Sequence, residues 1–183
     1  GYVMDDGTTA RLGDSHFVMT TTTAAAGLVM KHLEFVAQAL RPDLDVQMVS
    51  VTEEWAQFGV AGPKSRDVIN AVLDAPVDDA SFPSMSCAEV DVSGVRGRLF
   101  RISFSGEHAY EIAIPARYGD SLARELGKRA KALGGGWYGL EALNALRIEK
   151  GFITHAEMTG QFTADALFTP GLDKNGADSF GFK

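Results

Sequence analysis

The sequence is poor in cysteine, in basic residues and in long apolar runs. Its one cysteine, Cys87, cannot form an internal disulfide, which favours a reducing compartment and a cytoplasmic protein. Lysine and arginine number 17 against 24 acidic residues, and a net charge of −7 gives no broad cationic field for nucleic acid. No apolar run approaches the roughly 20 residues that span a bilayer, and no basic-then-apolar leader opens the chain. We therefore expect neither nucleic acid nor membrane as a partner.

Several catalytic motifs are missing as well. The sequence has no Walker A loop, dinucleotide fingerprint, zincin helix or paired-cysteine metal motif. Its four histidines have no spacing that places two on one helical face, so no metal is expected. The triplet Gly134–Gly136 follows a predicted helix where a phosphate loop would precede one, which indicates a cap and linker. Cys87 is expected to be a small buried residue.

The composition that remains, 45% hydrophobic and 22% charged, is that of a globular protein. Period-2 and period-3.6 patterns predict strands alternating with helices. Predicted strands cover residues 2–4, 10–12, 17–19, 46–52, 55–60, 88–92, 98–104 and 109–114. Predicted helices cover residues 24–40, with Thr23 as N-cap, a segment opened by Pro63, and residues 117–133 and 139–150. This order predicts an α+β fold of antiparallel hairpins interleaved with helices.

The same pattern suggests two halves. Residues 1–82 form a hairpin, helix, hairpin and helix, and residues 83–160 form three strands and two helices. Residues 161–183 read as an irregular tail that leads to a missing C-terminal region, and we expect the sequence to be a fragment of a longer chain.

Carboxylates are the most informative polar residues. In "RISFSGEHAYEIAIP", strand alternation places Glu111 on a face with Ala109 and Ala113, opposite Tyr110. Two alanines leave room for a ligand, although they suit a plain solvent face equally well.

Other charged residues also allow two readings. Asp5 and Asp6 precede a glycine, where they form either a turn or part of a site. Arg147 in "LRIEKG" satisfies a helix end, forms a surface ion pair, or belongs to a site.

Four short motifs carry a resemblance. "MDDG", "AGP", "FSGEHAYEIAIP" and "LRIEKG" occur in an order and spacing that resembles the aminomethyltransferase (glycine-cleavage T-protein) family over nearly all of residues 1–160. The longer stretches "VMDDGTTARLGDSHFVMTTTT" and "EEWAQFGVAGPKSR" are most similar to the carboxy-terminal, folate-binding part of the alpha subunit of heterotetrameric sarcosine oxidases.

The resemblance implies a tetrahydrofolate site. It places a catalytic carboxylate at Asp6, and the glutamate that hydrogen-bonds the pteridine at Glu111. Phe104 stands where the family has a tyrosine, and Leu143 where it has an arginine that grips the folate tail. The implied folate-binding residues are Glu111, Phe104, Tyr110 and Arg147.

The resemblance also implies a function. The chain would convert the methyleneiminium from sarcosine oxidation into 5,10-methylenetetrahydrofolate, with the other sarcosine oxidase subunits as partners. FAD, FMN and NAD are implied only for the rest of that complex, so the fragment alone should oxidise nothing. A stand-alone aminomethyltransferase or demethylase, and a non-catalytic folate-binding relative, remain alternatives.

Overall fold

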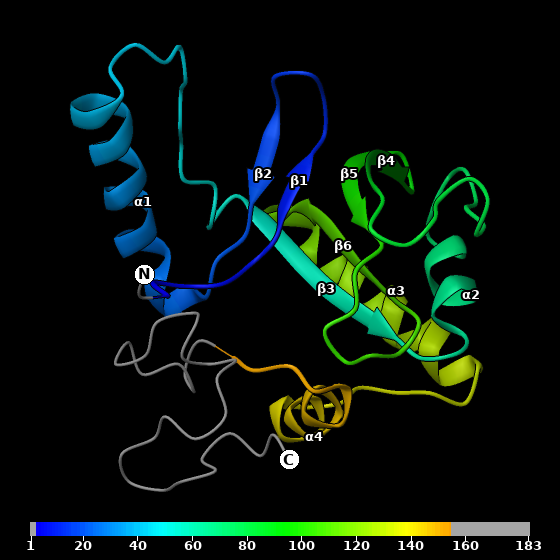
Figure 1. The fold of residues 1–183 in the computed structure, drawn as a ribbon. Coiled ribbons are helices and arrows are strands. Elements are labelled where there is room, and N and C mark those ends of the chain that lie inside the picture. The colour runs from blue at the N-terminus through cyan, green and yellow to red at the C-terminus, as the bar shows by residue number, and fades with distance from the viewer. Residues whose placement is uncertain (1–2, 155–183) are drawn as a thin grey trace, which may run out of the picture. The chain divides into compact units, whose positions relative to one another are not determined.

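The computed structural model describes residues 3–154, which form two compact units (Figure 1). Unit 1 contains residues 3–10, 17–50 and 153–154, and unit 2 contains residues 11–16 and 51–152. Helices and antiparallel strands alternate along the chain, which confirms the predicted α+β class. The predicted tail at residues 161–183 lies outside the described residues.

Unit 1 is built around one helix and a strand pair. Strands β1 (Thr9–Arg11) and β2 (Phe17–Met19) pair in a two-stranded sheet. A 3-10 turn, η1 (Thr23–Ala25), leads into α1 (Ala26–Phe35), and a π-helical turn, η2 (Val36–Leu40), extends it. The helix predicted over residues 24–40 is therefore present.

Three expectations for unit 1 are wrong. The cap position is Thr22 rather than Thr23, and its side chain makes no capping hydrogen bond. Val3 and Met4 lie outside any strand. Residues 46–52 also form no strand: the apolar Val46 and Val49 are exposed, and no described strand pairs with this segment to complete a ladder.

Unit 2 carries a four-stranded antiparallel sheet in the order β3-β6-β5-β4. Its strands are β3 (Trp55–Ala61), β4 (Cys87–Val92), β5 (Val95–Phe100) and β6 (Ala109–Pro115). β3 and the first helix after it precede residue 82, yet both lie in the same unit as the later strands.

The hydrophobic core lies on one face of this sheet. Registers Phe58↔Ile112 and Leu99↔Ile112 place these side chains on a common face. Helices α2 (Ser65–Asn70) and α3 (Gly119–Ala132) cover it, supplying Ile69 and Leu122 among others. The largest wholly buried side chains of the unit are Tyr110, Ile69, Leu99 and Ile112. The opposite face of β6 carries Glu111.

A tight turn shifts β5 relative to its predicted range of 98–104. Ser93 and Gly94 both have positive φ, 49° and 78°, the geometry of a two-residue hairpin turn. Val95 therefore pairs directly with Val92, and β5 begins three residues earlier than expected and ends at Phe100.

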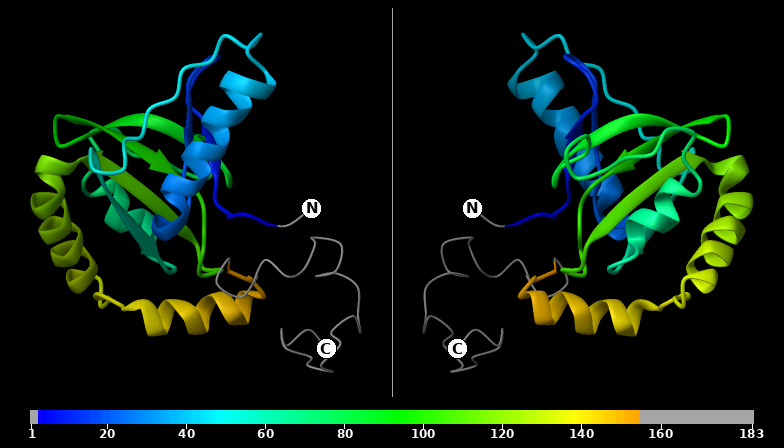
Figure 2. Two further views of the ribbon diagram at one scale, coloured as in Figure 1. Left: turned by 90° about the vertical axis from the view of Figure 1, so that its left-hand side faces the viewer. Right: turned by 90° about the vertical axis from the view of Figure 1, so that its right-hand side faces the viewer.

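The helices of unit 2 follow the sequence pattern closely. α2 begins at Ser65 rather than at Pro63, because Gly62 has a φ of 117° and the chain turns there before entering the helix. A 3-10 turn, η3 (Ala116–Tyr118), precedes α3, and α4 (Leu140–Lys150) ends at Gly151 with a φ of 85°. Figure 2 shows that the chain changes direction at the linker between α3 and α4. Among residues 3–154, no helix has the length and apolar character needed to cross a membrane.

Candidate functional site

A cavity of about 800 Å³ lies within unit 2. Edge strand β3 lines it with the consecutive residues 57–61, so both faces of this strand contribute. β6, the carboxyl half of α3 and the linker at residues 134–138 complete the wall. The glycine triplet thus ends α3, as predicted, and also lines the cavity.

Among the described residues, Glu111 is the only acidic side chain that lines this cavity. Residues on the same face of neighbouring strands surround it: Gly59 lies directly opposite on β3 and Phe100 on β5. Gln57 Nε2 donates a hydrogen bond to Glu111 Oε2. Burial raises the pKa of Glu111, and the Gln57 hydrogen bond opposes that rise. The site therefore holds a half-buried carboxylate with acceptor capacity beyond its one protein donor.

Gly59 leaves open space beside this carboxylate. A Cβ added at Gly59 would meet no atom within 4 Å, although Gly59 stands in the middle of a strand. Glycine weakens a strand interior, so its presence where backbone conformation does not require it indicates that something approaches closely. The carboxylate therefore has open space beside it within the cavity.

Two aromatic residues of the linker complete the wall. The Trp137 ring packs on α3 at Gly127, where an added Cβ would lie 2.8 to 2.9 Å from ring atoms. Burial raises the pKa of Tyr138, and the negative charge of Glu111 raises it further. Tyr138 thus lies within electrostatic reach of Glu111, and Gly127 allows the linker to approach.

Phe104 also lines the cavity, at the loop between β5 and β6. Its ring is 38% exposed and meets the Phe152 ring edge-on, with centroids 6.2 Å apart. Lys150 holds this loop, because its ammonium donates to the Ser103 carbonyl and lies 3.6 Å from the centre of the Phe152 ring. An exposed aromatic face at the cavity wall is available for stacking.

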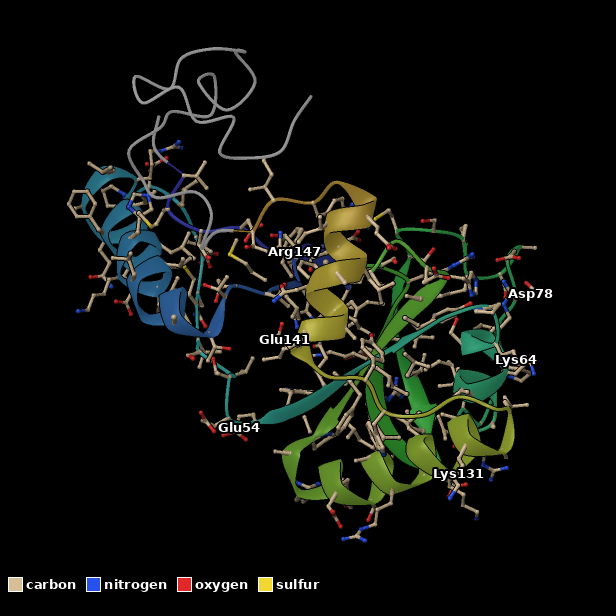
Figure 3. All side chains as sticks on the ribbon, turned by 90° about the horizontal axis from the view of Figure 1, so that it is seen from below. Glu54, Lys64, Asp78, Lys131, Glu141 and Arg147 are labelled. Atoms are coloured by element: carbon tan, nitrogen blue, oxygen red, sulfur yellow. The ribbon has the colours of Figure 1, made fainter. Side chains whose placement is uncertain are left out.

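Arg147 lies on α4, where Figure 3 labels it, and its side chain is buried. It is not among the residues that line the cavity. Its Nη1 donates to the Phe152 carbonyl at 2.9 Å and its Nε to Asn144 Oδ1 at 3.2 Å. These bonds satisfy the end of the helix, one of the three roles that the sequence left open. The α4 residue that does line the cavity is Leu143.

Tyr110 lies in the core, on the opposite face of β6 from Glu111, as strand alternation predicts. Its side chain is 0% exposed and packs against Phe82 and His108. The Tyr110 hydroxyl accepts a hydrogen bond from Arg66 Nε at 3.2 Å. Tyr110 is nevertheless one of the residues that line the cavity, so it belongs both to the core and to the cavity wall.

Asp5 and Asp6 lie in unit 1 and differ in their surroundings. Asp5 accepts hydrogen bonds from the Thr22 backbone N–H at 2.9 Å and the Thr22 hydroxyl at 2.8 Å. This ties the N-terminal segment to the start of η1. Asp6 is exposed. Asp5 thus has a structural role through a long-range contact rather than through the local turn that the sequence allowed, and Asp6 is exposed to solvent.

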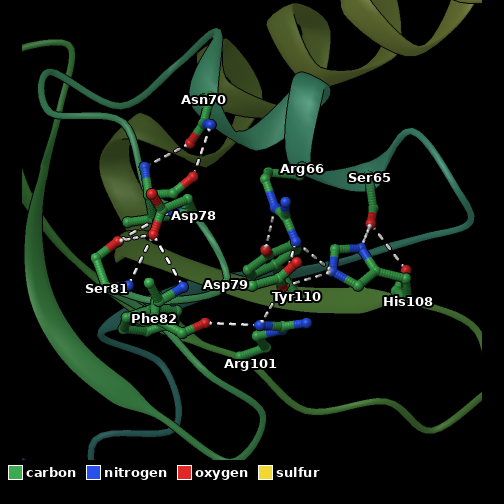
Figure 4. Close-up of polar contacts among 12 residues, drawn as sticks. Ser65, Arg66, Asn70, Asp78, Asp79, Ser81, Phe82, Arg101, His108 and Tyr110 are labelled. Carbon is green, nitrogen blue, oxygen red and sulfur yellow. Dashed lines mark hydrogen bonds and ion pairs between the residues drawn. The ribbon is translucent and has the colours of Figure 1, made fainter.

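A second polar cluster, shown in Figure 4, surrounds Asp79. Its carboxylate pairs with Arg66 and, at 2.7 Å, with Arg101, and these guanidinium groups lower the pKa of Asp79. His108 Nε2 lies 3.9 Å from Asp79 Oδ1. Burial lowers the pKa of His108 and the two arginines lower it further, against the opposing effect of Asp79.

In space, Ser65 contacts His108 and His108 lies beside Asp79, which is the arrangement of residue types in a catalytic triad. Ser65 Oγ lies 2.8 Å from His108 Nδ1, but it also donates to the His108 carbonyl at 2.8 Å. Because the hydroxyl proton is directed to that carbonyl, the imidazole does not act as its base. Ser65 is 2% exposed, and two arginines hold Asp79. The cluster fastens α2 to β6.

Metal-ligating residues do not gather in the part of the chain that the structure describes: no three His, Cys, Asp or Glu side chains come together there. His155 lies outside those residues. Cys87 is half-buried at the start of β4, rather than fully buried as expected, because the register places it on the face of Glu111, opposite the core.

The residues of the cavity wall that sequence reasoning missed include Gln57, Lys64, Trp137 and Tyr138. The alternation in "WAQFGVA" was a usable signal for Gln57, because it places Gln57 and Gly59 on one face of β3. The linker residues had no periodic signal, since their position depends on the direction of the chain after α3.

The structure thus shows an α+β domain with a cavity that is lined by a half-buried carboxylate. Residues 1–167 match the GCVT N-terminal domain family, and the chain belongs to this family. The membership expected from the four motifs is thus confirmed.

Two relatives and one solved structure illustrate the match. The chain is 52% identical over 162 residues to sarcosine oxidase subunit alpha from Rhizobium meliloti, covering 87% of this chain and 16% of that protein. It is 43% identical over 172 residues to sarcosine oxidase subunit alpha from Corynebacterium sp. strain P-1, covering 93% of this chain and 17% of that protein. The chain thus spans about a sixth of the length of these relatives.

A solved structure supports the fold. Heterotetrameric sarcosine oxidase from Corynebacterium sp. U-96, in complex with pyrrole 2-carboxylate, matches with a TM-score of 0.52 and 15% identity. The match covers 80% of this chain and 64% of that chain.

Proposed function

We propose that this chain is the tetrahydrofolate-binding part of a one-carbon-transfer module in a sarcosine oxidase alpha subunit. The observation that carries the proposal is Glu111, a carboxylate with one protein donor, facing the open space over Gly59. The pteridine edge presents adjacent N–H donors, and a fixed carboxylate can accept two of them at once. The likeness to sarcosine oxidase alpha subunits supports the same ligand.

Each wall of the cavity suits one part of such a ligand. Glu111 binds the pteridine edge, while Gly59 provides the space for the ring. Phe104 provides an exposed aromatic face for stacking, without the hydroxyl of the family's tyrosine. Tyr110 lines the cavity and packs in the core on the opposite face of β6 from Glu111, and Arg147 holds the end of α4.

Asp6 is assigned to proton transfer. Tetrahydrofolate, when bound, supplies the two nitrogen nucleophiles that capture the methyleneiminium carbon from sarcosine oxidation. The bond from that carbon to the amine nitrogen breaks, and the two N–H protons of folate end on the released glycine as its ammonium group. A carboxylate can accept such a proton and return it, and Asp6 is the exposed one of the acidic pair. The product is 5,10-methylenetetrahydrofolate.

Calorimetric titration tests the binding assignment. The protein that contains this chain should bind 5-formyltetrahydrofolate, and Glu111→Gln should weaken binding about fivefold to 150-fold. That range corresponds to about 1 to 3 kcal/mol for a ligand donor left without its acceptor. Glu54→Gln, the same change on an exposed side chain outside the cavity, is the matched control. Equal affinity of wild type and Glu111→Gln would rule out the assignment.

Methylene transfer tests the role of Asp6 separately. Asp6→Asn should retain folate binding and lose most of the conversion of sarcosine carbon into methylenetetrahydrofolate, with formaldehyde released to water instead. Asp14→Asn, an exposed residue paired with Arg11 at 2.8 Å, is the control. Equal loss of binding and transfer in Asp6→Asn would mean that Asp6 is only structural.

A further inference from the structure

The cavity holds one charge of each sign. Of the lining residues within 3–154, Glu111 is the only carboxylate and Lys64 the only cation. Between them the wall is apolar or glycine, including Val60, Ala61 and Gly62. A complementary ligand therefore carries hydrogen-bond donors at one end and a negative charge at the other.

Lys64 is held at the cavity by a rigid turn. The Gly62 N–H donates to the His108 carbonyl at 2.9 Å, and the Ser65 N–H donates to the Gly62 carbonyl at 3.0 Å. Pro63 fixes its own φ within this turn. The first bond fastens the turn to the residue that precedes β6, and the second closes the turn around Lys64.

The Lys64 ammonium is placed without a countercharge. Its Nζ donates to the Leu133 carbonyl at 3.0 Å, at the carboxyl end of α3. Within residues 3–154, Lys64 forms no ion pair. An ammonium group has three donors and this carbonyl takes one, so donors and charge remain for a ligand.

The spacing of the two charges suits an extended ligand. Gly59, which faces Glu111, and Lys64 are five positions apart in the chain. Five extended residues span at most about 17 Å, and the turn at Gly62 shortens this distance. A ligand whose head and anionic tail are separated by one aromatic ring falls within that length.

We propose that Lys64 binds the tail carboxylates of folate, and this inference rests on the proposed function. The resemblance to the family placed a tail-binding arginine at Leu143, which lines the same cavity without a charge. The turn before α2 thus supplies, through Lys64, a cation that α4 does not. The site selects reduced folates with an intact glutamate tail over pterins that lack one.

A two-ligand titration tests the proposal in the protein that contains this chain. The probes are 5-formyltetrahydrofolate, which has the tail, and 6-methyltetrahydropterin, which does not. Lys64→Met should weaken binding of the folate about twofold to fivefold, the range for a partly exposed ion pair, and leave the pterin unaffected. Lys64→Arg should restore folate affinity because it keeps the charge. Lys131→Met removes a charge from the exposed surface of α3 and should change neither affinity.

Salt provides a second readout. Folate affinity of the wild type should fall more steeply with ionic strength than that of Lys64→Met, because the exposed pair is screened. Three results would overturn the role of Lys64 and leave the proposed function standing. They are equal salt dependence of the two proteins, unchanged folate affinity in Lys64→Met, and equal losses of affinity for both probes in Lys64→Met. Glu111→Gln should weaken both probes. If the wild type binds neither probe, the proposed function fails and the tail site fails with it.

Discussion

Replacing Glu111 by glutamine should stabilise the fold while it weakens the ligand. Folding moves the carboxylate into a half-buried position, where Gln57 Nε2 is its one protein donor among the described residues. Burial raises the pKa of Glu111 above its ordinary value of 4.5. Between the pKa of Glu111 in the unfolded chain and its higher pKa in the folded protein, the folded protein binds more protons than the unfolded chain. The free energy of unfolding therefore falls as pH rises through this window. The stability that Glu111 contributes is complete below about pH 4.5 and is lost as pH rises through the folded pKa.

Glutamine keeps an oxygen that can accept from Gln57 and does not ionise. Wild type and Glu111→Gln should thus have similar free energies of unfolding at acidic pH. At pH 8 the variant should be more stable by about 1 kcal/mol, which is the low end of the cost of a buried polar group that lacks hydrogen-bond partners. Urea unfolding of the chain, followed by tryptophan fluorescence, should show a midpoint about 0.3 to 1 M higher for the variant at pH 8. Glu54→Gln should change the free energy by no more than about 0.5 kcal/mol at either pH. A Glu111→Gln variant that is less stable than wild type at pH 8, or a difference that does not change with pH, would refute the reasoning.

Two further predictions concern the sheet. Gly97→Ala should lower the free energy of unfolding by about 1 to 3 kcal/mol, because the added Cβ would lie 2.7 Å from the Ala113 carbonyl oxygen. In Gly59→Ala the added Cβ meets open space, so this control variant should not be destabilised. Equal denaturation midpoints for the two variants would contradict the prediction. Ser65→Ala should lower the free energy of unfolding by about 1 to 3 kcal/mol, because the hydrogen bonds to His108 are lost. A fluorophosphonate probe should not label Ser65 in the wild type. Labelling would show that the triad-like cluster is catalytic.

The sequence predicts the elements of unit 2 well because local chemistry determines them. Alternation in "AYEIAIP" separates Glu111 from Tyr110 and Ile112, and the structure has the same division of faces. Gly151 ends α4 with a positive φ, as a helix-terminating glycine should. The pattern is wrong at residues 46–52, because a strand also needs a partner strand and none of the described strands pairs with this segment. A local sequence pattern does not indicate whether such a partner exists.

The candidate site was only partly predictable, for a related reason. Glu111 and Phe104 were found from alternation and resemblance, and both line the cavity. Lys64 and Tyr138 were not, because each reaches the cavity through a loop whose course depends on long-range contacts. Arg147, expected at the ligand, instead holds the end of its own helix.

A crystal structure of the protein that contains this chain, with 5-formyltetrahydrofolate bound, would test the central claim most directly. The account predicts a pteridine over Gly59, with two ring-edge nitrogens about 2.7 to 3.2 Å from the Glu111 carboxylate oxygens. A pteridine bound elsewhere, with the Glu111 carboxylate still hydrogen-bonded only to Gln57, would contradict it.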